Sequence, residues 1–271
     1  MKIKANLRKA LPDEARADAQ VYQAIVGSLT YLAQSTRPDL AYAVSALGKI
    51  CADPTETHLT AAKRVLRYLR GTSEVKLTFG GPQAQGDIKA FVDSDWAADK
   101  EDRKSTSGFI FTPGGGAVSW GSRKQSAVAL STAEVEYVAV GVAGRKAVAV
   151  GGMLDAVGRP VGTMLVHCDN QAALHLLKHA GAHHARSKHI DIVHHWVRDK
   201  VREGALAFEY IPTDLNPADA FTKALSVDKH RLMGLSLAMG AVATGAVGDV
   251  QIAGGEAALR GSVRAALLAV A

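Results

Sequence analysis

Acidic side chains stand at several places in this sequence where a strand should end or a helix should begin. Asp93 and Asp169 each follow a short apolar run that is typical of a strand. Glu136 lies in the first turns of an expected long helix, and Asp219 lies in the first turn of another. If the two strands are neighbours, Asp93 and Asp169 meet at the sheet edge where α/β proteins commonly bind ligands.

Carboxylates gathered in this way point to metal-ion chemistry. They repel one another, and burial strengthens the repulsion, so a cluster of them is stable when cations lie between them. Oxygen ligands favour Mg²⁺, or Mn²⁺ in its place, over zinc. Two such ions about 4 Å apart can hydrolyse a phosphodiester: one orients and deprotonates water, and the other stabilises the leaving oxygen. We therefore expect a two-ion site.

Structural roles compete for the same acids. The run from Ser131 to Glu134 has the pattern of a capping box, which gives Glu134 a structural role and makes Glu136 the better candidate ligand. Asp219 could instead favour the dipole of the helix that it begins. Asp169 could cap the helix that follows it. Taken singly, none of these acids identifies a metal site.

Composition limits the class of protein. The chain has 271 residues, 48% of them apolar, which predicts one large or two modest folded domains. It has only two cysteines, which argues against a disulfide framework and favours a reducing compartment. The charged N-terminus lacks the apolar core of a signal peptide, so we expect a cytoplasmic protein with no membrane partner. A net charge of +6 is compatible with a polyanionic partner.

The elements that must position the acids follow from periodicity. Residues 19–72 have the apolar spacing of three helices, the third capped by Asp53 and ended by Gly71. After about residue 87 the period changes to that of strands, followed by alternating helices and strands, so we expect an α/β fold. We divide the chain into a loose leader (1–18), a helical segment (19–80), an α/β domain (87–240) and a low-complexity Ala/Gly tail (241–271).

Longer motifs in fixed order resemble the ribonuclease H domain of copia-type retrotransposon Pol polyproteins. They are Phe91-Val-Asp-Ser-Asp-Trp-Ala, Asp102-Arg-Lys-Ser-Thr-Ser-Gly-Phe, Leu130-Ser-Thr-Ala-Glu-Val-Glu-Tyr, Cys168-Asp-Asn-Gln, Arg186-Ser-Lys-His-Ile-Asp and Asn216-Pro-Ala-Asp-Ala-Phe-Thr-Lys. The helical front, with Val26-Gly-Ser-Leu-Thr-Tyr-Leu-Ala and Thr36-Arg-Pro-Asp-Leu-Ala-Tyr-Ala-Val, resembles the connection segment that links reverse transcriptase to that domain.

The resemblance implies a fold and an activity. The fold would be a ribonuclease H-like mixed five-stranded sheet flanked by helices and preceded by a small helical segment. Asp93, Glu136, Asp169 and Asp219 match the four acids that hold the metal ions in that family. The implied reaction is Mg²⁺-dependent cleavage of the RNA strand of an RNA/DNA hybrid, and the implied protein partner is the reverse transcriptase portion of the same polyprotein.

Two features keep an alternative open. The loop Ile211-Pro-Thr-Asp-Leu215 lacks the mobile histidine that some relatives place before the fourth acid. Gly151 and Gly152 lie within the expected long helix, where each costs about 1 kcal/mol relative to alanine. The alternative is a catalytically inactive retrotransposon remnant that binds nucleic acid or docks onto reverse transcriptase.

A hybrid is close to A-form, so proteins recognise it by its shape, its 2′-hydroxyls and its phosphates. Basic and amide side chains near the four acids are candidates for these contacts, although a solvated surface explains most of them equally well. The candidates are Arg123, Lys124, Gln125, Asn170, Gln171, Arg186 and Lys188.

Histidines offer a separate metal hypothesis. Eight of the ten lie between residues 167 and 195, and His175, His179 and His183 repeat every four residues. No cysteine or second acidic cluster completes a zinc site around them, so we favour the carboxylate site.

Overall fold

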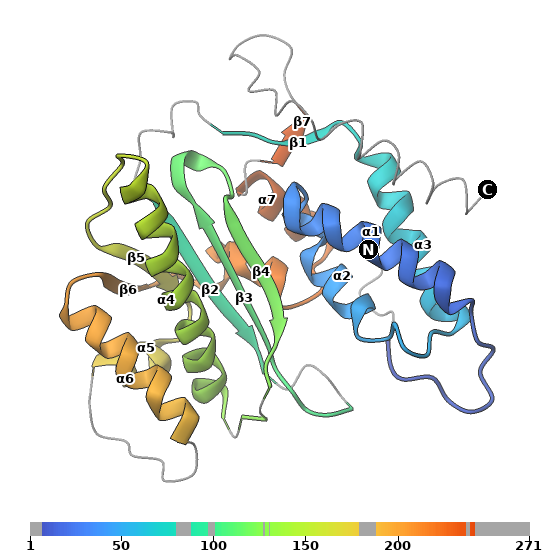
Figure 1. The fold of residues 1–271 in the computed structure, drawn as a ribbon, viewed down its shortest axis with the longest axis horizontal. Coiled ribbons are helices and arrows are strands. Elements are labelled where there is room, and N and C mark those ends of the chain that lie inside the picture. Colours follow the sequence, from blue (N-terminus) through green and yellow to red (C-terminus); the bar gives the residue numbers. More distant parts are fainter. Residues whose placement is uncertain are drawn as a thin grey trace.

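The structure is a computed structural model, and it describes residues 7–79, 88–96, 101–126, 128–129, 131–178, 188–236 and 239–241. Its centre is a five-stranded sheet with the order β4-β3-β2-β5-β6 (Figure 1). The strands are β2 (Lys89–Asp95), β3 (Thr106–Thr112), β4 (Ser119–Lys124), β5 (Met164–Cys168) and β6 (Leu206–Tyr210). The sheet is mixed, because β2, β3 and β4 are antiparallel whereas β2, β5 and β6 are parallel.

Strand register brings two of the acids to one edge. Val92 on β2 lies beside Cys168 on β5 in the parallel pair. The next residues along the two strands are Asp93 and Asp169, so both acids lie at the C-terminal edge of the sheet. The expectation that these strands are neighbours is confirmed.

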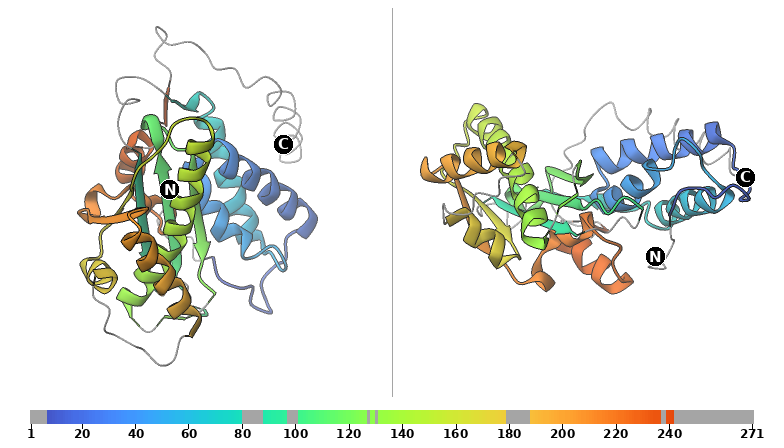
Figure 2. Two further views of the ribbon diagram at one scale, coloured as in Figure 1. Left: turned by 60° about the vertical axis from the view of Figure 1, so that its left-hand side comes forward. Right: turned by 90° about the horizontal axis from the view of Figure 1, so that it is seen from below.

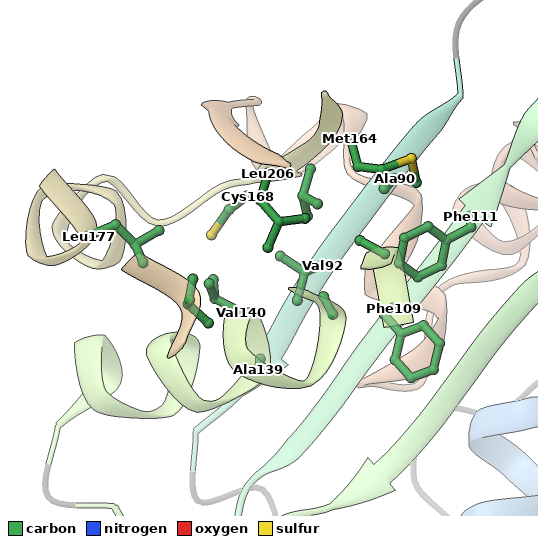
Figure 3. Packing of buried hydrophobic residues seen from close by; sticks show 14 of the residues in the cluster. Ala90, Val92, Phe109, Phe111, Ala139, Val140, Met164, Cys168, Leu177 and Leu206 are labelled. Carbon is green, nitrogen blue, oxygen red and sulfur yellow. The ribbon is translucent and has the colours of Figure 1, made fainter. Parts of the chain in front are cut away.

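One face of the sheet is covered by the helices α4 (Thr132–Ala156), α5 (Gln171–Lys178) and α6 (Lys188–Arg202) (Figures 1 and 2). Figure 3 shows the apolar packing between this face and α4, with Val92 of the sheet near Ala139 and Val140 of the helix. Among the described residues, one helical stretch, Glu134–Ala156, has the length and apolar composition of a membrane span. Half of its most apolar window is buried inside the fold.

The opposite face packs against the 3₁₀ helix η4 (Pro217–Phe221) and the helix α7 (Val227–Ser236). Phe221 is fully buried there against Ile110 and the partly buried Phe91. The helix expected to begin with Asn216 and Pro217 is confirmed, and it has 3₁₀ geometry. The Asn216 side chain caps it by accepting from the Ala218 N–H, and α7 begins ten residues after Pro217.

The N-terminal helices form a second apolar cluster next to β4. They are α1 (Ala19–Ser35), α2 (Ala41–Gly48), preceded by the turn η1 (Pro38–Leu40), and α3 (Glu56–Gly71). The expected cap of α3 at Asp53 was wrong. Thr55 is the cap and His58 completes a capping box, while Asp53 forms an ion pair with Arg16 at 2.7 Å.

Two short strands were not expected from the sequence. β1 (Val75–Leu77) pairs antiparallel with β7 (Met239–Ala241), which joins the end of the helical segment to the end of the α/β region. Part of the expected leader is also hydrogen-bonded, because Ala17 N–H donates to Pro54 O at 3.0 Å. Residues 242–271 of the expected tail lie outside the described residues.

The α/β fold class predicted from the sequence is confirmed. The chain has a mixed five-stranded sheet flanked by helices, and a small helical segment precedes it. The turn η2 (Pro113–Gly115) joins β3 to β4, as expected from its glycines, and Gly115 has a φ of 84°. The turn η3 (Thr213–Leu215) precedes η4.

Candidate metal centre

The four predicted acids lie in two overlapping groups. Ligand atoms of Asp93, Asp169 and Asp219 are all within 4.8 Å of one another. Ligand atoms of Glu136, Cys168 and Asp169 meet the same limit. Asp169 belongs to both groups, so the four carboxylates form one continuous cluster.

Strand alternation explains why the cluster straddles the sheet edge. Successive side chains of a strand point to opposite faces. Asp93 contacts Thr222, just after η4 on one face, whereas Glu136 extends from α4 on the other. Asp169 follows the last residue of β5 and lies within reach of both sides. The site is therefore assembled from two faces and a strand end.

Asp93 is held by the segment around η4. The Thr222 hydroxyl donates to Asp93 Oδ2 in a short hydrogen bond. The Asn216 amide donates to Val92 O at 2.9 Å, which fixes the start of η4 against β2. Gly108, opposite Asp93 on β3, permits this approach, because a Cβ there would lie 2.7 Å from Thr222 Cγ2.

Asp219 is fully buried and is bound by two lysines. Lys223 Nζ lies 2.7 Å from Asp219 Oδ1, and Lys229 Nζ lies 2.7 Å from Asp219 Oδ2. Lys223 Nζ also lies 3.9 Å from Asp93 Oδ2. A favourable helix dipole alone does not account for a carboxylate enclosed in this way. Neither lysine was predicted from the sequence, although the four-residue spacing of Asp219 and Lys223 is a usable signal.

Glu134 and Glu136 have different surroundings. The Ser131 hydroxyl accepts from the Glu134 N–H at 3.2 Å, so Ser131 caps α4 as expected. Glu136 is 7% exposed, and its Oε2 is buried without a hydrogen-bond partner. The structure brings Glu136, and not Glu134, into the acidic cluster.

Asp169 is not the cap of α5. Asn170 has that role, since its Oδ1 accepts from the Ala173 N–H at 3.0 Å. The Oδ1 atom of Asp169 is buried and has no hydrogen-bond partner. Because an unpaired buried polar atom is costly, unpartnered oxygens on Asp169 and Glu136 favour a ligand between them.

The electrostatics of the cluster are those of a cation site. Burial, together with the charges of Asp93 and Asp169, raises the pKa of Glu136 to about 8, although hydrogen bonds from Ser94 oppose the rise. Burial likewise raises the pKa of Asp93, although Lys223 and the Thr222 hydrogen bond oppose the rise. Burial lowers the pKa of Lys223, but its hydrogen bond to Asp219 and the nearby carboxylates leave that pKa above its usual value. A divalent cation would relieve the same repulsion, so these residues fit one.

The candidate substrate contacts have different surroundings. Gln125 is buried, and its amide nitrogen donates to Ser107 Oγ at 2.8 Å and Val135 O at 3.0 Å. Both of its amide N–H groups are therefore used within the fold, which corrects the view of Gln125 as a contact on the surface. This side chain instead ties β3 to the start of α4.

The other candidates include exposed and engaged side chains. Lys124 forms an ion pair with Asp102 at 2.7 Å, and Asn170 caps α5. Arg123 and Gln171 are exposed. Lys188 is the first residue of α6, and Arg186 lies outside the described residues.

Only part of the histidine-rich stretch lies among the described residues. Neither group of potential metal ligands found among the described residues includes a histidine. His175 is exposed on α5. His179 and His183 lie outside the described residues.

Comparisons with known proteins identify several relatives. No protein-family model matches the chain. Over 211 residues it is 41% identical to the retrovirus-related Pol polyprotein from transposon TNT 1-94 of Nicotiana tabacum, a match that covers 78% of this chain and 16% of that protein. Over 212 residues it is 40% identical to the corresponding protein from transposon RE1 of Arabidopsis thaliana, covering 77% of this chain and 14% of that protein. The chain thus spans about a sixth or less of the length of these relatives.

A solved structure similar to this chain is the ribonuclease H1 of the archaeon Halobacterium salinarum NRC-1. It is 20% identical with a TM-score of 0.35, and the match covers 51% of this chain and 95% of that one. The sequence relatives show that the chain is homologous to a part of the retrovirus-related Pol polyproteins of transposons.

Proposed function

We propose that this protein is a Mg²⁺-dependent endonuclease that cleaves the RNA strand of RNA/DNA hybrids. The observation that supports the proposal most directly is the convergence of Asp93, Glu136, Asp169 and Asp219 from two strands, a helix and a 3₁₀ turn. The similarity to a part of Pol polyproteins and the motif resemblance to their ribonuclease H domain support the same reaction.

These four carboxylates would hold two Mg²⁺ ions, with Mn²⁺ as a substitute. Bound there, the ions would supply an activated water and would stabilise the leaving 3′-oxygen. The unpartnered oxygens of Glu136 and Asp169 and the close approach of Asp93 to Asp219 support this assignment.

The chain's own residues prepare the site. Lys223 and Lys229 neutralise Asp219, so the buried carboxylates tolerate one another before substrate arrives. Thr222 orients Asp93 by donating to its Oδ2. The Lys223 side chain is 38% exposed, so it could also contact a phosphate of the bound nucleic acid.

The substrate and partners belong to the same proposal. Exposed Arg123 and Gln171 are suited to phosphate and 2′-hydroxyl contacts, and Lys124 is suited to phosphate if Asp102 releases it. We assign residues 19–80 to the connection segment of reverse transcriptase, which would be the partner within the polyprotein. An intracellular site of action follows from that role.

The test uses a labelled RNA/DNA hybrid, Mg²⁺ and the full chain. We expect RNA cleavage by the parent protein and a loss of roughly a hundredfold or more in Asp93→Asn and Asp169→Asn, because each removes a ligand whose ion is worth several kcal/mol. Glu134→Gln, two residues from Glu136, is the matched control and should retain cleavage. Binding of the hybrid without cleavage would contradict the proposal and support the inactive binding module.

A further inference from the structure

Cys168 is a buried thiol in contact with the acidic cluster. It ends β5 and belongs to the apolar cluster between the sheet and α4, where Figure 3 shows it near Leu206. Its Sγ nevertheless lies within 4.8 Å of ligand atoms of Glu136 and Asp169. The hydrolytic reaction proposed above makes no use of this sulfur.

Three observations distinguish this position from an ordinary core cysteine. Glu136 is more than nine-tenths buried, and its Oε2 has no hydrogen-bond partner. Asp169 Oδ1 is buried and equally without one. The Asn170 N–H lies 3.5 Å from Cys168 Sγ and donates to it, a contact that stabilises a sulfur with negative charge. Two oxygens and one sulfur thus converge with spare coordination capacity.

We propose that Glu136, Cys168 and Asp169 form a binding site for one thiophilic divalent cation, of the type of Zn²⁺ or Cd²⁺. A thiolate is a soft ligand that selects Zn²⁺ and its heavier relatives, whereas an all-carboxylate set suits Mg²⁺. The other group, Asp93 with Asp169 and Asp219, contains no sulfur. The two sides of the cluster therefore differ in the ions that they prefer.

Binding at this site includes the loss of one proton. The cation forms a bond to sulfur as the S–H bond breaks, and the proton passes to the solvent buffer. The site rests on this geometry alone and does not require that the chain cleave nucleic acid.

The proposed Zn²⁺ or Cd²⁺ site shares Asp169 with the other group of ligands, so binding there affects Mg²⁺. A cation held by Glu136, Cys168 and Asp169 occupies two of the four carboxylates that Mg²⁺ would use. Low concentrations of Zn²⁺ or Cd²⁺ are therefore expected to exclude Mg²⁺ from part of the cluster.

The test measures metal–sulfur bonding directly. Cys51 is the only other cysteine, so the full chain with Cys51→Ser has a single thiol. Titrating this variant with Cd²⁺ should produce the ultraviolet charge-transfer band of a Cd–thiolate bond, saturating at one ion per chain. The band should be absent when Cys168→Ser is added, with the circular dichroism spectrum showing that the chain is folded.

Carboxylate variants complete the test. Glu136→Gln in the Cys51→Ser background should weaken Cd²⁺ binding roughly tenfold or more, while Glu134→Gln should leave it unchanged. Absence of the band in folded Cys51→Ser protein would overturn the proposal, as would a band that Glu136→Gln does not weaken. A chain that gives the band yet fails to cut a hybrid would remove only the proposed nuclease function.

Discussion

Asp219 is the most enclosed of the four acids, and two ammonium groups hold it. Each carboxylate oxygen faces one lysine at 2.7 Å, from Lys223 on one side and Lys229 on the other. A buried charge is stable only when it is paired, so these lysines compensate the carboxylate when no cation is bound. A divalent ion would compete with them for the same oxygens.

Removing one lysine should therefore cost stability that a metal ion can restore. Lys229→Ala is expected to lower the free energy of unfolding by about 1–3 kcal/mol in the presence of a chelator, since it leaves one oxygen of Asp219 without its cation. Mg²⁺ should recover most of this loss. Lys200→Ala is the control, because Lys200 pairs with the exposed Glu203 and such a pair contributes about 0–1 kcal/mol. Equal losses in the two variants, measured by denaturant unfolding, would contradict this account.

Glu136 predicts a specific pH dependence. Its ordinary pKa is 4.5 and its pKa in the folded chain is about 8, so between these values the folded state binds a proton that the unfolded state has lost. The contribution of Glu136 to the free energy of unfolding is therefore fully present below pH 4.5 and is lost as the pH rises through 8.

Replacing Glu136 by glutamine should remove this loss of stability at high pH. Without divalent ions, Glu136→Gln should be more stable than the parent at pH 8.5 by at least about 1.4 kcal/mol, the equivalent of one pKa unit, and nearly equal to it at pH 4. Thermal unfolding at both pH values measures the difference. A variant that is less stable than the parent at pH 8.5 would show that Glu136 is not strained by burial.

At the scale of elements, the acids come together because η4 packs closely on β3. Gly108 lies opposite Asp93, and a Cβ on Gly108 would lie 2.7 Å from Thr222 Cγ2 and 2.8 Å from Phe221 Cβ. The absence of a side chain at this position brings Thr222 and Asp219 to the end of β2.

Gly108→Ala should accordingly displace η4. We expect a destabilisation of about 1–3 kcal/mol from the steric overlap and a weaker affinity for Mn²⁺. Gly152→Ala is the opposite case, because nothing lies within 4 Å of its Cβ position inside α4, and it should stabilise the protein by about 0.5–1 kcal/mol. Chemical denaturation of both variants tests the pair, and a Gly108→Ala protein of unchanged stability would contradict the packing argument.

The sequence predicts those parts of this site that depend on local pattern. The apolar runs before Asp93 and Asp169 identify two strand ends, and Ser131 identifies the start of α4, which separates Glu136 from Glu134. Contacts between distant segments leave no local pattern. Lys229 reaches Asp219 only because α7 folds back along η4, and Gln125 is buried because Val135 O and Ser107 lie beside it.

The predicted bounds of helices and strands also differ from the structure where contacts between distant segments decide them. Asp53 and Thr55 are both good helix caps by residue type, and the ion pair of Asp53 with Arg16 leaves the cap to Thr55. β1 and β7 have three residues each, too short for a periodic signal, and they exist because they pair with each other. Asp219 lies in the helix expected after Asn216, and the residue pattern there does not distinguish its 3₁₀ geometry from that of an α-helix.

At the scale of the whole molecule, the helical segment and the sheet share an interface. Trp120 on β4 donates from its indole N–H to Ala33 O on α1 at 2.7 Å. On α3, the Tyr68 hydroxyl donates to Asp39, and the His230 ring lies edge-on to Tyr68 with centroids 5.8 Å apart. His230 follows Lys229 on α7, so one helix contacts both the helical segment and the acidic site.

This interface predicts that the two regions unfold together. Tryptophan fluorescence and far-ultraviolet circular dichroism should give coincident denaturation curves for the full chain, as expected for one cooperative unit. Trp120→Phe should shift both curves by about 0.5–1.5 kcal/mol, because it deletes one interface hydrogen bond. Two separated transitions would show that the segments are energetically independent.

The central claim is that four carboxylates from distant parts of the chain create one cation site. The most direct measurement is an anomalous difference map from a crystal of the full chain soaked in Mn²⁺. We predict anomalous density between the carboxylates of Asp93, Asp169 and Asp219, and its loss in crystals of Asp169→Asn. A map in which Mn²⁺ binds elsewhere, or in which the four side chains point to separate faces of the protein, would contradict the account.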